Sequence, residues 1–255
     1  MRNIRLTLAF DGTAYQGWQV QPGRRTIQGV LGEALRAITG EPVVLHGSGR
    51  TDAGAHARGM VVNFHTGSRI PAGSLLRAVN GMLPEDVRVL KASVVPGSFH
   101  ARRSATSKVY RYQIFRGAVL PPHQVREHLH YPHPLDLERM RSAASRFIGV
   151  HDFASFAAKS GSAKRESPRG TVREVHRAEL SEHASRLCFT VEGDGFLHHM
   201  VRNMVGTLLE VGRGRMSIDD FEQLFECRDR TRAGTTAPAR GLVLIKVRYG
   251  RQRPA

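Results

Sequence analysis

Cysteine is scarce in this sequence, in which Cys188 and Cys227 are the two among 255 residues. Two cysteines cannot supply a disulfide framework or a zinc cluster, so we expect ordinary thiols in a reducing cytoplasm. Long apolar runs are missing too, and no stretch approaches the roughly 20 residues needed to cross a bilayer. The first residues, MRNIRL, lack the apolar segment and cleavage site of a secretory signal, so we expect none.

Acidic residues are few relative to basic ones. Asp and Glu number 22 against 38 Lys and Arg, which gives a formal net charge of +16. A soluble protein this basic needs an anionic partner, and nucleic acid is the first candidate. Only five of the 38 cations are lysines. Arginine grips phosphate with paired N–H groups and stacks on bases, but an arginine-rich codon usage explains this ratio equally well.

The spacing of apolar residues predicts two successive β-α-β-β-α-β units. The clearest helix of the first unit covers 26–38, with Thr26 as its N-cap and Gly40 as its stop. The other elements of this unit are a helix at 72–82 and strands at 4–10, 42–46, 60–65 and 87–95. The second unit has helices at 135–148, 196–211 and 218–227 and strands at 109–115, 171–180, 185–192 and 242–249.

This order of elements predicts an α+β fold with two domains, residues 1–105 and 106–255. We expect two ferredoxin-like, RRM-like halves that form a mostly antiparallel mixed sheet. Helices are expected on one face of the sheet and an RNA-binding cleft on the other, because an open sheet face offers a platform for bases. Many unrelated proteins share this fold, so the fold alone decides no function.

The glycine-rich loop 47–59, GSGRTDAGAHARG, is the most unusual stretch. It carries one carboxylate, Asp52, one imidazole, His56, and two cations, Arg50 and Arg58. We expect His56 and both arginines to contact the substrate. It lacks the Gly-Lys-Ser or Gly-Lys-Thr ending of a phosphate-binding P-loop and lies between two strands, which argues against a nucleotide site. An aspartate in such a loop is often only a turn residue. Arginines beside it keep a carboxylate ionised and hence nucleophilic, which favours a catalytic Asp52.

Two further stretches carry candidate site residues. Tyr110 and Tyr112 alternate on a predicted strand, where packing explains one tyrosine and base stacking or proton transfer is open to the other. Arg202 lies on the border of the apolar stripe of the helix 196–211, and a half-buried arginine usually has a carboxylate partner. The histidines of 128–133 match no common zinc spacing, so we expect no metal there.

Two basic segments, 159–170 and 228–240, are almost free of apolar residues. One interpretation is a pair of flexible, solvated loops. The other, which the net charge favours, is a set of phosphate contacts that become ordered on RNA. In the first segment the candidate contacts are Lys164, Arg165 and Arg169.

Seven blocks, in order along the chain, together resemble the tRNA pseudouridine synthase A family. They span almost the whole chain and read DGTAYQGWQVQ (11–21), GRTDAGAH (49–56), FHAR (99–102), KVYRY (108–112), HDFASF (151–156), GFLHHMVRNMVG (195–206) and TAPARGL (236–242). Phe10 and Ala55 stand where the family more often has Tyr and Val, which leaves the chemistry unaffected.

The resemblance implies an isomerase that converts uridine to pseudouridine at positions 38, 39 and 40 of the tRNA anticodon stem and loop. It implies a homodimer with one tRNA contacting both subunits, and neither cofactor nor metal. By this resemblance Asp52 is the nucleophile, Tyr110 the active-site tyrosine and Arg202 the partner of Asp52. Arg50 fills the space that the displaced base leaves.

Two other functions are consistent with parts of the sequence. A non-catalytic RNA-binding protein with two RRM-like halves fits the fold, but segment 58–64, RGMVVNF, lacks the central aromatics of an RNP1 block. A metal-dependent nuclease needs clustered carboxylates, and none of the candidate loops has two. The RNA-binding protein also gives no reason for an aspartate inside a basic loop, because a carboxylate repels phosphate.

If the first basic segment contacts RNA, neutralising Lys164, Arg165 and Arg169 together should weaken tRNA binding. It should also flatten the dependence of affinity on salt, because fewer condensed counterions are released. The single-turnover rate at saturating enzyme should stay nearly unchanged. Filter binding across a salt series checks this, and parental affinity and slope in the triple variant would identify a plain solvated loop.

Overall fold

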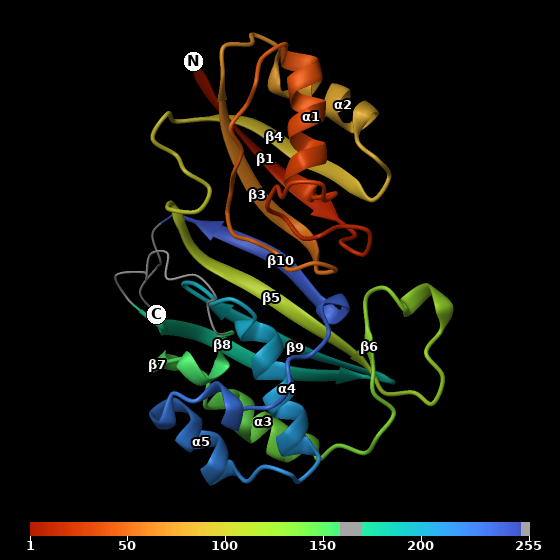
Figure 1. Ribbon diagram of the computed structural model, residues 1–255, viewed down its shortest axis with the longest axis vertical. Coiled ribbons are helices and arrows are strands. Elements are labelled where there is room, and N and C mark those ends of the chain that lie inside the picture. Colours follow the sequence, from red (N-terminus) through yellow and green to blue (C-terminus); the bar gives the residue numbers. More distant parts are fainter. Residues whose placement is uncertain (159–169, 251–255) are drawn as a thin grey trace. The chain divides into compact units, whose positions relative to one another are not determined.

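The computed structural model describes residues 1–158 and 170–250 (Figure 1). The contacts between Cα atoms divide the chain into two compact units. The first is Met1–Thr106 together with the strand that continues from Val243, and the second is Ser107–Leu242. The sequence places residues from 243 onward with the second half. In the structure they group with the first half because β10 pairs with β3.

The first unit follows the predicted order of elements. Its elements are β1 (Arg2–Phe10), α1 (Ile27–Thr39), β2 (His46–Gly47), β3 (His56–Thr66), α2 (Ala72–Met82) and β4 (Val87–Val95). Strand β1 lies between β3 and β4 and pairs antiparallel with both. Strand β10 (Leu242–Tyr249) pairs parallel with the beginning of β3, where Val243 lies opposite His56.

The two faces of this sheet differ sharply in character. Ile4, Leu6 and Leu8 of β1 are 0% exposed. Arg5 and Thr7, which alternate with them, are only partly covered. Helices α1 and α2 contact each other, and α2 contacts β4, so their apolar stripes cover the Ile-Leu face. The opposite face carries polar side chains, among them Arg5 and Thr7 of β1 and Asn63 of β3.

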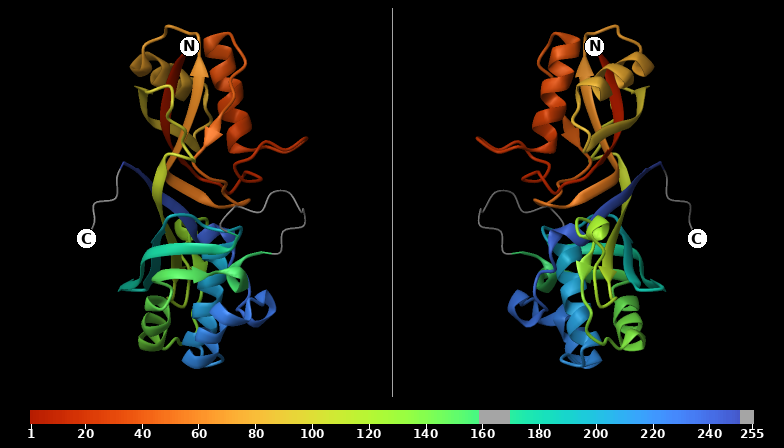
Figure 2. Two further views of the ribbon diagram at one scale, coloured as in Figure 1. Left: turned by 90° about the vertical axis from the view of Figure 1, so that its left-hand side faces the viewer. Right: turned by 90° about the vertical axis from the view of Figure 1, so that its right-hand side faces the viewer.

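The second unit has more elements than the sequence predicts. Its elements are β5 (Ala105–Phe115), β6 (Leu129–His130), α3 (Leu137–Ser145), β7 (Gly149–Asp152), β8 (Val172–His183), β9 (Arg186–Gly193), α4 (Met200–Gly212) and α5 (Ile218–Cys227). Strand β9 pairs antiparallel with β5 and β8, and β8 pairs antiparallel with β7. Helices α3, α4 and α5 lie together on one side of β8 and β9 (Figures 1 and 2).

An aromatic cluster forms the core beneath these helices. The ring of Phe147 lies 5.1 Å from that of Phe221 and 5.2 Å from that of Phe156. Phe153 and Phe189 also belong to the cluster, and these five rings are 0% exposed. The partly exposed Phe225 packs against four of them. The mixed α+β class and the mostly antiparallel pairing are therefore confirmed for the described residues.

The differences from the predicted elements have local causes. The strand predicted at 42–46 shrinks to His46–Gly47, since only this part pairs with β3 and Pro42 has no N–H to offer. Helix α4 begins at Met200 rather than at residue 196. His199 before it takes a left-handed conformation with φ 60°, which cannot belong to the helix.

The two caps predicted for α1 are present, and α5 has a cap of its own. The side chain of Thr26 accepts the N–H of Gly29, and Gly40 ends α1 with φ 73°. Ser217 and Asp220 form a reciprocal capping box at the start of α5. These caps explain why the ends of both helices are readable from the sequence.

Replacing Thr26 by Ala should lower the free energy of unfolding by about 1 kcal/mol, because the N–H of Gly29 loses its acceptor. The Thr26→Ser variant keeps the oxygen and should stay close to the parent. Urea unfolding followed by circular dichroism measures both. Equal losses in the two variants would mean that the threonine methyl group, rather than the cap, provides the stability.

Candidate active-site segments

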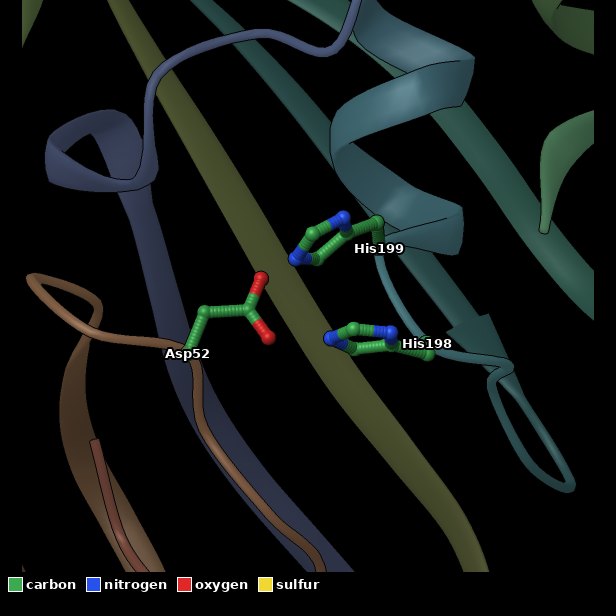
Figure 3. A group of neighbouring side chains, drawn as sticks. All are labelled: Asp52, His198 and His199. Carbon is green, nitrogen blue, oxygen red and sulfur yellow. The ribbon is translucent and has the colours of Figure 1, made fainter. Parts of the chain in front are cut away.

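Asp52 lies on the loop between β2 and β3, and its carboxylate is partly exposed (Figure 3). The loop makes a tight turn at this point, in which the N–H of Ala55 donates to the carbonyl oxygen of Asp52 at 3.1 Å. Gly54 within the turn has φ 78°, a conformation that favours glycine. The glycines of this loop therefore shape the backbone around a single acidic side chain.

The segment 11–18 packs directly against the Asp52 loop. The N–H of Trp18 donates to the carbonyl of Thr51 at 3.2 Å, and the N–H of Gly54 donates to the carbonyl of Tyr15 at 3.3 Å. A Cβ at Gly17 would lie 2.5 Å from the Thr51 oxygen. A Cβ at Gly12 would overlap the carbonyl of Ala55. Backbone meets backbone here, and no larger residue fits at either glycine.

Buried side chains anchor segment 11–18 in turn. Tyr15 is 1% exposed, and its hydroxyl donates to the carboxylate of Asp86. Burial and the adjacent Asp86 raise the pKa of the Tyr15 phenol, so the phenol stays protonated as a donor. The guanidinium of Arg25 lies 4.7 Å from the centre of the Tyr15 ring. This anchoring connects the DGTAYQGW block to the position of Asp52.

The three other candidates of the loop differ in exposure. Arg50 and Arg58 are exposed. His56 is 3% exposed and begins β3, which starts four residues earlier than the sequence predicts. The Nδ1 atom of His56 accepts the N–H of Gly12 at 3.1 Å and lies 3.2 Å from a carboxylate oxygen of Asp11. Both hold the start of segment 11–18.

In the second unit the two tyrosines of β5 have different surroundings. Tyr112 is 0% exposed, and its hydroxyl donates to the carbonyl of Pro238 at 2.7 Å. Burial raises the pKa of its phenol, which keeps it protonated. Tyr110 is 7% exposed and meets Phe196 edge to face, with ring centres 5.0 Å apart. Tyr112 is thus the packing tyrosine of the pair.

Arg202 lies on α4 and is partly buried. Its Nε–H donates to the carbonyl of Ala237 at 2.7 Å, while the N–H of Ala237 donates to the carbonyl of Arg202 at 3.2 Å. This reciprocal pair fixes the plane of the guanidinium. The other guanidinium nitrogens carry its remaining N–H donors, which are suited to a carboxylate.

Sequence reasoning missed the role of Asn203, which is 0% exposed within the apolar stripe of α4. Its amide nitrogen donates to the carbonyl of Phe156 at 2.7 Å. Its amide oxygen accepts from Arg230 at 2.9 Å and from Thr236 at 2.7 Å. The signal was present in the sequence, since an asparagine inside an apolar helix face needs buried partners.

The interpretation of 228–240 as a flexible loop is wrong. Arg230 bonds to Asn203 and Thr236, Arg228 lies 2.9 Å from the carboxylate of Asp152, and Arg232 bonds to Gln223 at 2.9 Å. Burial lowers the pKa of Arg230. These three arginines therefore hold the segment to the rest of the second unit.

The start of α4 carries two adjacent histidines. The rings of His198 and His199 have centres 3.8 Å apart and planes tilted by 36° (Figure 3). His198 is the more exposed of the two. Of the predicted RNA contacts, Lys164, Arg165 and Arg169 lie outside the described residues. The segments described here therefore carry Asp52 in the first unit and Tyr110 and Arg202 in the second.

Comparison with known proteins identifies the family. A sequence model described as tRNA pseudouridine synthase matches residues 7–102 and 143–250. The tRNA pseudouridine synthase A 1 of Desulfotalea psychrophila is 45% identical over 98% of this chain and 100% of its own length. The tRNA pseudouridine synthase A of Lacticaseibacillus casei is 44% identical over 98% of this chain and 100% of its own length.

The chain belongs to the tRNA pseudouridine synthase family. It is an isomerase that converts uridine to pseudouridine in tRNA. Among solved structures, an archaeal box H/ACA sRNP Nop10–Cbf5 complex aligns with a TM-score of 0.36 and 12% identity over 92% of this chain and 58% of that one. No helix among the described residues is long and apolar enough to span a membrane.

Replacing Gly12 by Ala should reduce the turnover number about 100-fold, because the added methyl group displaces Ala55 and with it the Asp52 turn. Gly81, on α2, has open space around it, so Gly81→Ala is the matched control and should keep parental turnover. Pseudouridine formation on saturating tRNA measures both. Parental turnover in a folded Gly12→Ala protein would contradict the positioning role of segment 11–18.

Proposed function

We propose that this enzyme acts on uridines at positions 38, 39 and 40 of the tRNA anticodon stem and loop, with Asp52 as its nucleophile. The observation that carries the proposal is the Asp52 loop itself. One partly exposed carboxylate stands on a backbone that segment 11–18 holds by hydrogen bonds and by contacts only glycine allows. A group that must meet one atom of a substrate needs this kind of fixed support.

The reaction is an isomerisation, and it balances within the uridine. The bond from C1′ to N1 breaks, the uracil turns, and a bond from C1′ to C5 forms. The proton on C5 leaves, and N1 gains a proton. A carboxylate serves this chemistry as a transient covalent partner on the sugar or on the base, and it is regenerated at the end.

The other proposed residues support this step. Tyr110 stacks on the uracil, and its hydroxyl takes part in removing the C5 proton. Arg202 pairs with Asp52, and the hydrogen bond from its Nε–H to the carbonyl of Ala237 orients the guanidinium for this contact. Extruding a base from its stack costs a few kcal/mol, and Arg50 lowers that cost by filling the gap.

Contacts with the tRNA backbone are proposed for four further cations. Arg58 is one, and Lys164, Arg165 and Arg169 of the first basic segment are the others. His56, the remaining substrate-binding candidate of the loop, stays a prediction. Because it is 3% exposed and accepts from Gly12, it positions the segment that supports the Asp52 loop.

We further propose a cytoplasmic homodimer in which one tRNA contacts both subunits, and chemistry that needs neither cofactor nor metal. The reaction involves no change of oxidation state, which agrees with this expectation. The alternative of a non-catalytic RNA-binding protein is not favoured, because the chain belongs to a family of isomerases.

One assay tests the proposed reaction directly. The purified protein is incubated with unmodified tRNA carrying tritium at C5 of uridine, in the presence of EDTA. Release of tritium, with pseudouridine mapped to positions 38, 39 and 40, is the expected result. Modification confined to other positions would contradict the proposed site of action, and activity lost in EDTA would contradict the metal-free chemistry.

Replacing Asp52 by Asn should abolish pseudouridine formation while the dissociation constant for tRNA stays within about tenfold of the parent. One carboxylate adds little to the affinity for a polyanion and partly opposes it. Electrophoretic mobility shift and tritium release measure the two quantities. Clear turnover by a sequence-verified Asp52→Asn preparation would remove Asp52 from its role.

The two tyrosines of β5 should respond in opposite ways to loss of the hydroxyl. Tyr110→Phe should lose most activity yet still bind tRNA. Tyr112→Phe should keep most activity but lose about 1 kcal/mol of stability, because the buried Pro238 carbonyl loses its donor. Turnover and urea unfolding are measured for both variants. Equal losses of activity would contradict the assignment.

A further inference from the structure

Segment 230–238, which lies between α5 and β10 in the chain, meets α4 at two neighbouring residues. The hydroxyl of Thr236 donates to the side-chain oxygen of Asn203 at 2.7 Å. The next residue, Ala237, is hydrogen-bonded in both directions to Arg202, the helix residue that precedes Asn203. Because Thr236 and Ala237 are joined by one peptide bond, the contact of Thr236 limits where the Ala237 carbonyl can lie.

Thr236, Asn203 and Arg230 form a closed set of three hydrogen bonds. One terminal nitrogen of Arg230 donates to the side-chain oxygen of Asn203 at 2.9 Å and to the hydroxyl of Thr236 at 3.0 Å. The Thr236 hydroxyl therefore accepts from Arg230, and its own proton is directed to Asn203. A hydroxyl can do both at once, so the three side chains have one consistent assignment of donors and acceptors.

The amide of Asn203 has a single workable orientation. Its nitrogen donates to the carbonyl of Phe156 at 2.7 Å, and the residue is 0% exposed. Half a turn of the amide would bring its NH₂ group against the donors of Arg230 and its oxygen against the Phe156 carbonyl. Buried polar atoms left in this way lose their partners, which is costly. Asn203 is therefore a fixed acceptor on α4 for Thr236 and Arg230.

Arg230 is a partly buried cation whose partners in the described part of the chain are uncharged oxygens. Its other terminal nitrogen donates to the carbonyl of Ala233 at 3.3 Å, and burial lowers its pKa. A buried charge costs free energy, and apolar residues in place of buried ionic groups are often neutral or stabilising. Stability alone therefore does not account for Arg230. What it adds is a fixed separation between the Asn203 and Thr236 oxygens that it joins.

We infer that Thr236, held by Asn203 and Arg230, is a positioning residue for Arg202. Its hydrogen bonds fix the peptide whose carbonyl, that of Ala237, accepts the Nε–H of Arg202 at 2.7 Å. A guanidinium is planar, so a fixed Nε–H sets the plane in which its other donors point. Thr236 acts through Arg202 and not on the substrate. The inference rests on the proposed function in taking Arg202 as a residue of the reaction.

The first experiment compares three variants with the parent enzyme. Thr236→Val keeps the shape of the side chain but loses the hydroxyl, and Thr236→Ser keeps the hydroxyl. Ser155→Ala is the matched control. It removes a buried hydroxyl of the same unit that donates to the carbonyl of Leu224 on α5 at 2.6 Å, and not to segment 230–238.

The turnover number on saturating tRNA should fall about tenfold in Thr236→Val, because a guanidinium that has moved loses its alignment with the group it serves. The dissociation constant for tRNA should stay within about twofold of the parent, since no charge is removed. Thr236→Ser and Ser155→Ala should keep parental turnover. Urea unfolding of Thr236→Val and Ser155→Ala shows that a difference in turnover does not come from a difference in stability.

A second readout follows Arg202 itself and needs no assay of activity. In ¹⁵N-labelled protein each arginine Nε–H gives its own magnetic resonance signal, and a hydrogen-bonded N–H exchanges its proton slowly with water. The signal that disappears in Arg202→Lys belongs to Arg202. Its exchange should be slow in the parent, in Thr236→Ser and in Ser155→Ala, and at least about tenfold faster in Thr236→Val.

Arg230→Met tests the other use that this cation could have. It should lower turnover and speed the exchange of the Arg202 Nε–H as Thr236→Val does, while the slope of log tRNA affinity against log salt stays parental. A slope reduced by about one unit, with parental exchange at Arg202, would identify Arg230 as a phosphate contact and overturn its role in the positioning.

Two further results would overturn the inference. Parental exchange of the Arg202 Nε–H in Thr236→Val would show that Thr236 does not hold Arg202. An equal loss of turnover in Thr236→Ser, or in Ser155→Ala, would show that the loss does not depend on the Thr236 hydroxyl. Failure of the proposed function gives a different result. Faster exchange in Thr236→Val with parental turnover would confirm the positioning and remove Arg202 from the reaction.

Discussion

The contact between segment 11–18 and the Asp52 loop is the constraint on which the first unit's chemistry depends. Two irregular stretches of backbone meet there at a distance that leaves no room for a Cβ at Gly12 or Gly17. Irregular loops are usually the most mobile parts of a protein. Here the carbonyl and N–H groups of each loop satisfy those of the other, so Asp52 stands on a rigid support built without regular secondary structure.

In the second unit, contacts between a helix and a loop fix the orientation of Arg202. Gly206 on α4 and Gly234 in the following loop approach so closely that a side chain at either position would overlap backbone atoms. Thr207 accepts the N–H of Gly234 at 3.0 Å, and the buried Asn203 joins Arg230 and Thr236. These contacts bring Ala237 to Arg202 and so orient the guanidinium. The loop that follows α5 thus serves to hold one arginine in a fixed orientation.

The large positive charge of the protein has two different uses. Some cations are structural, such as Arg230, which lies in the interior network of the second unit, and Arg25, which lies over the Tyr15 ring. Others are exposed, such as Arg50, Arg58, Arg102 and Arg103. Net charge alone therefore overstates the number of groups available to RNA. A desolvated guanidinium that bonds to protein groups stabilises the fold and cannot contact a phosphate.

Local pattern determined much of this protein from its sequence alone. Apolar periodicity and capping residues locate α2, α5, β4 and β10 residue by residue, since both signals lie within the element itself. Glycine content and one acidic side chain mark the Asp52 loop. Only the tertiary structure decided that β3 begins at His56, that β10 belongs with the first unit and that Arg230 is structural. Each of these depends on a partner distant in the chain, and no periodicity within a segment carries information about such a partner.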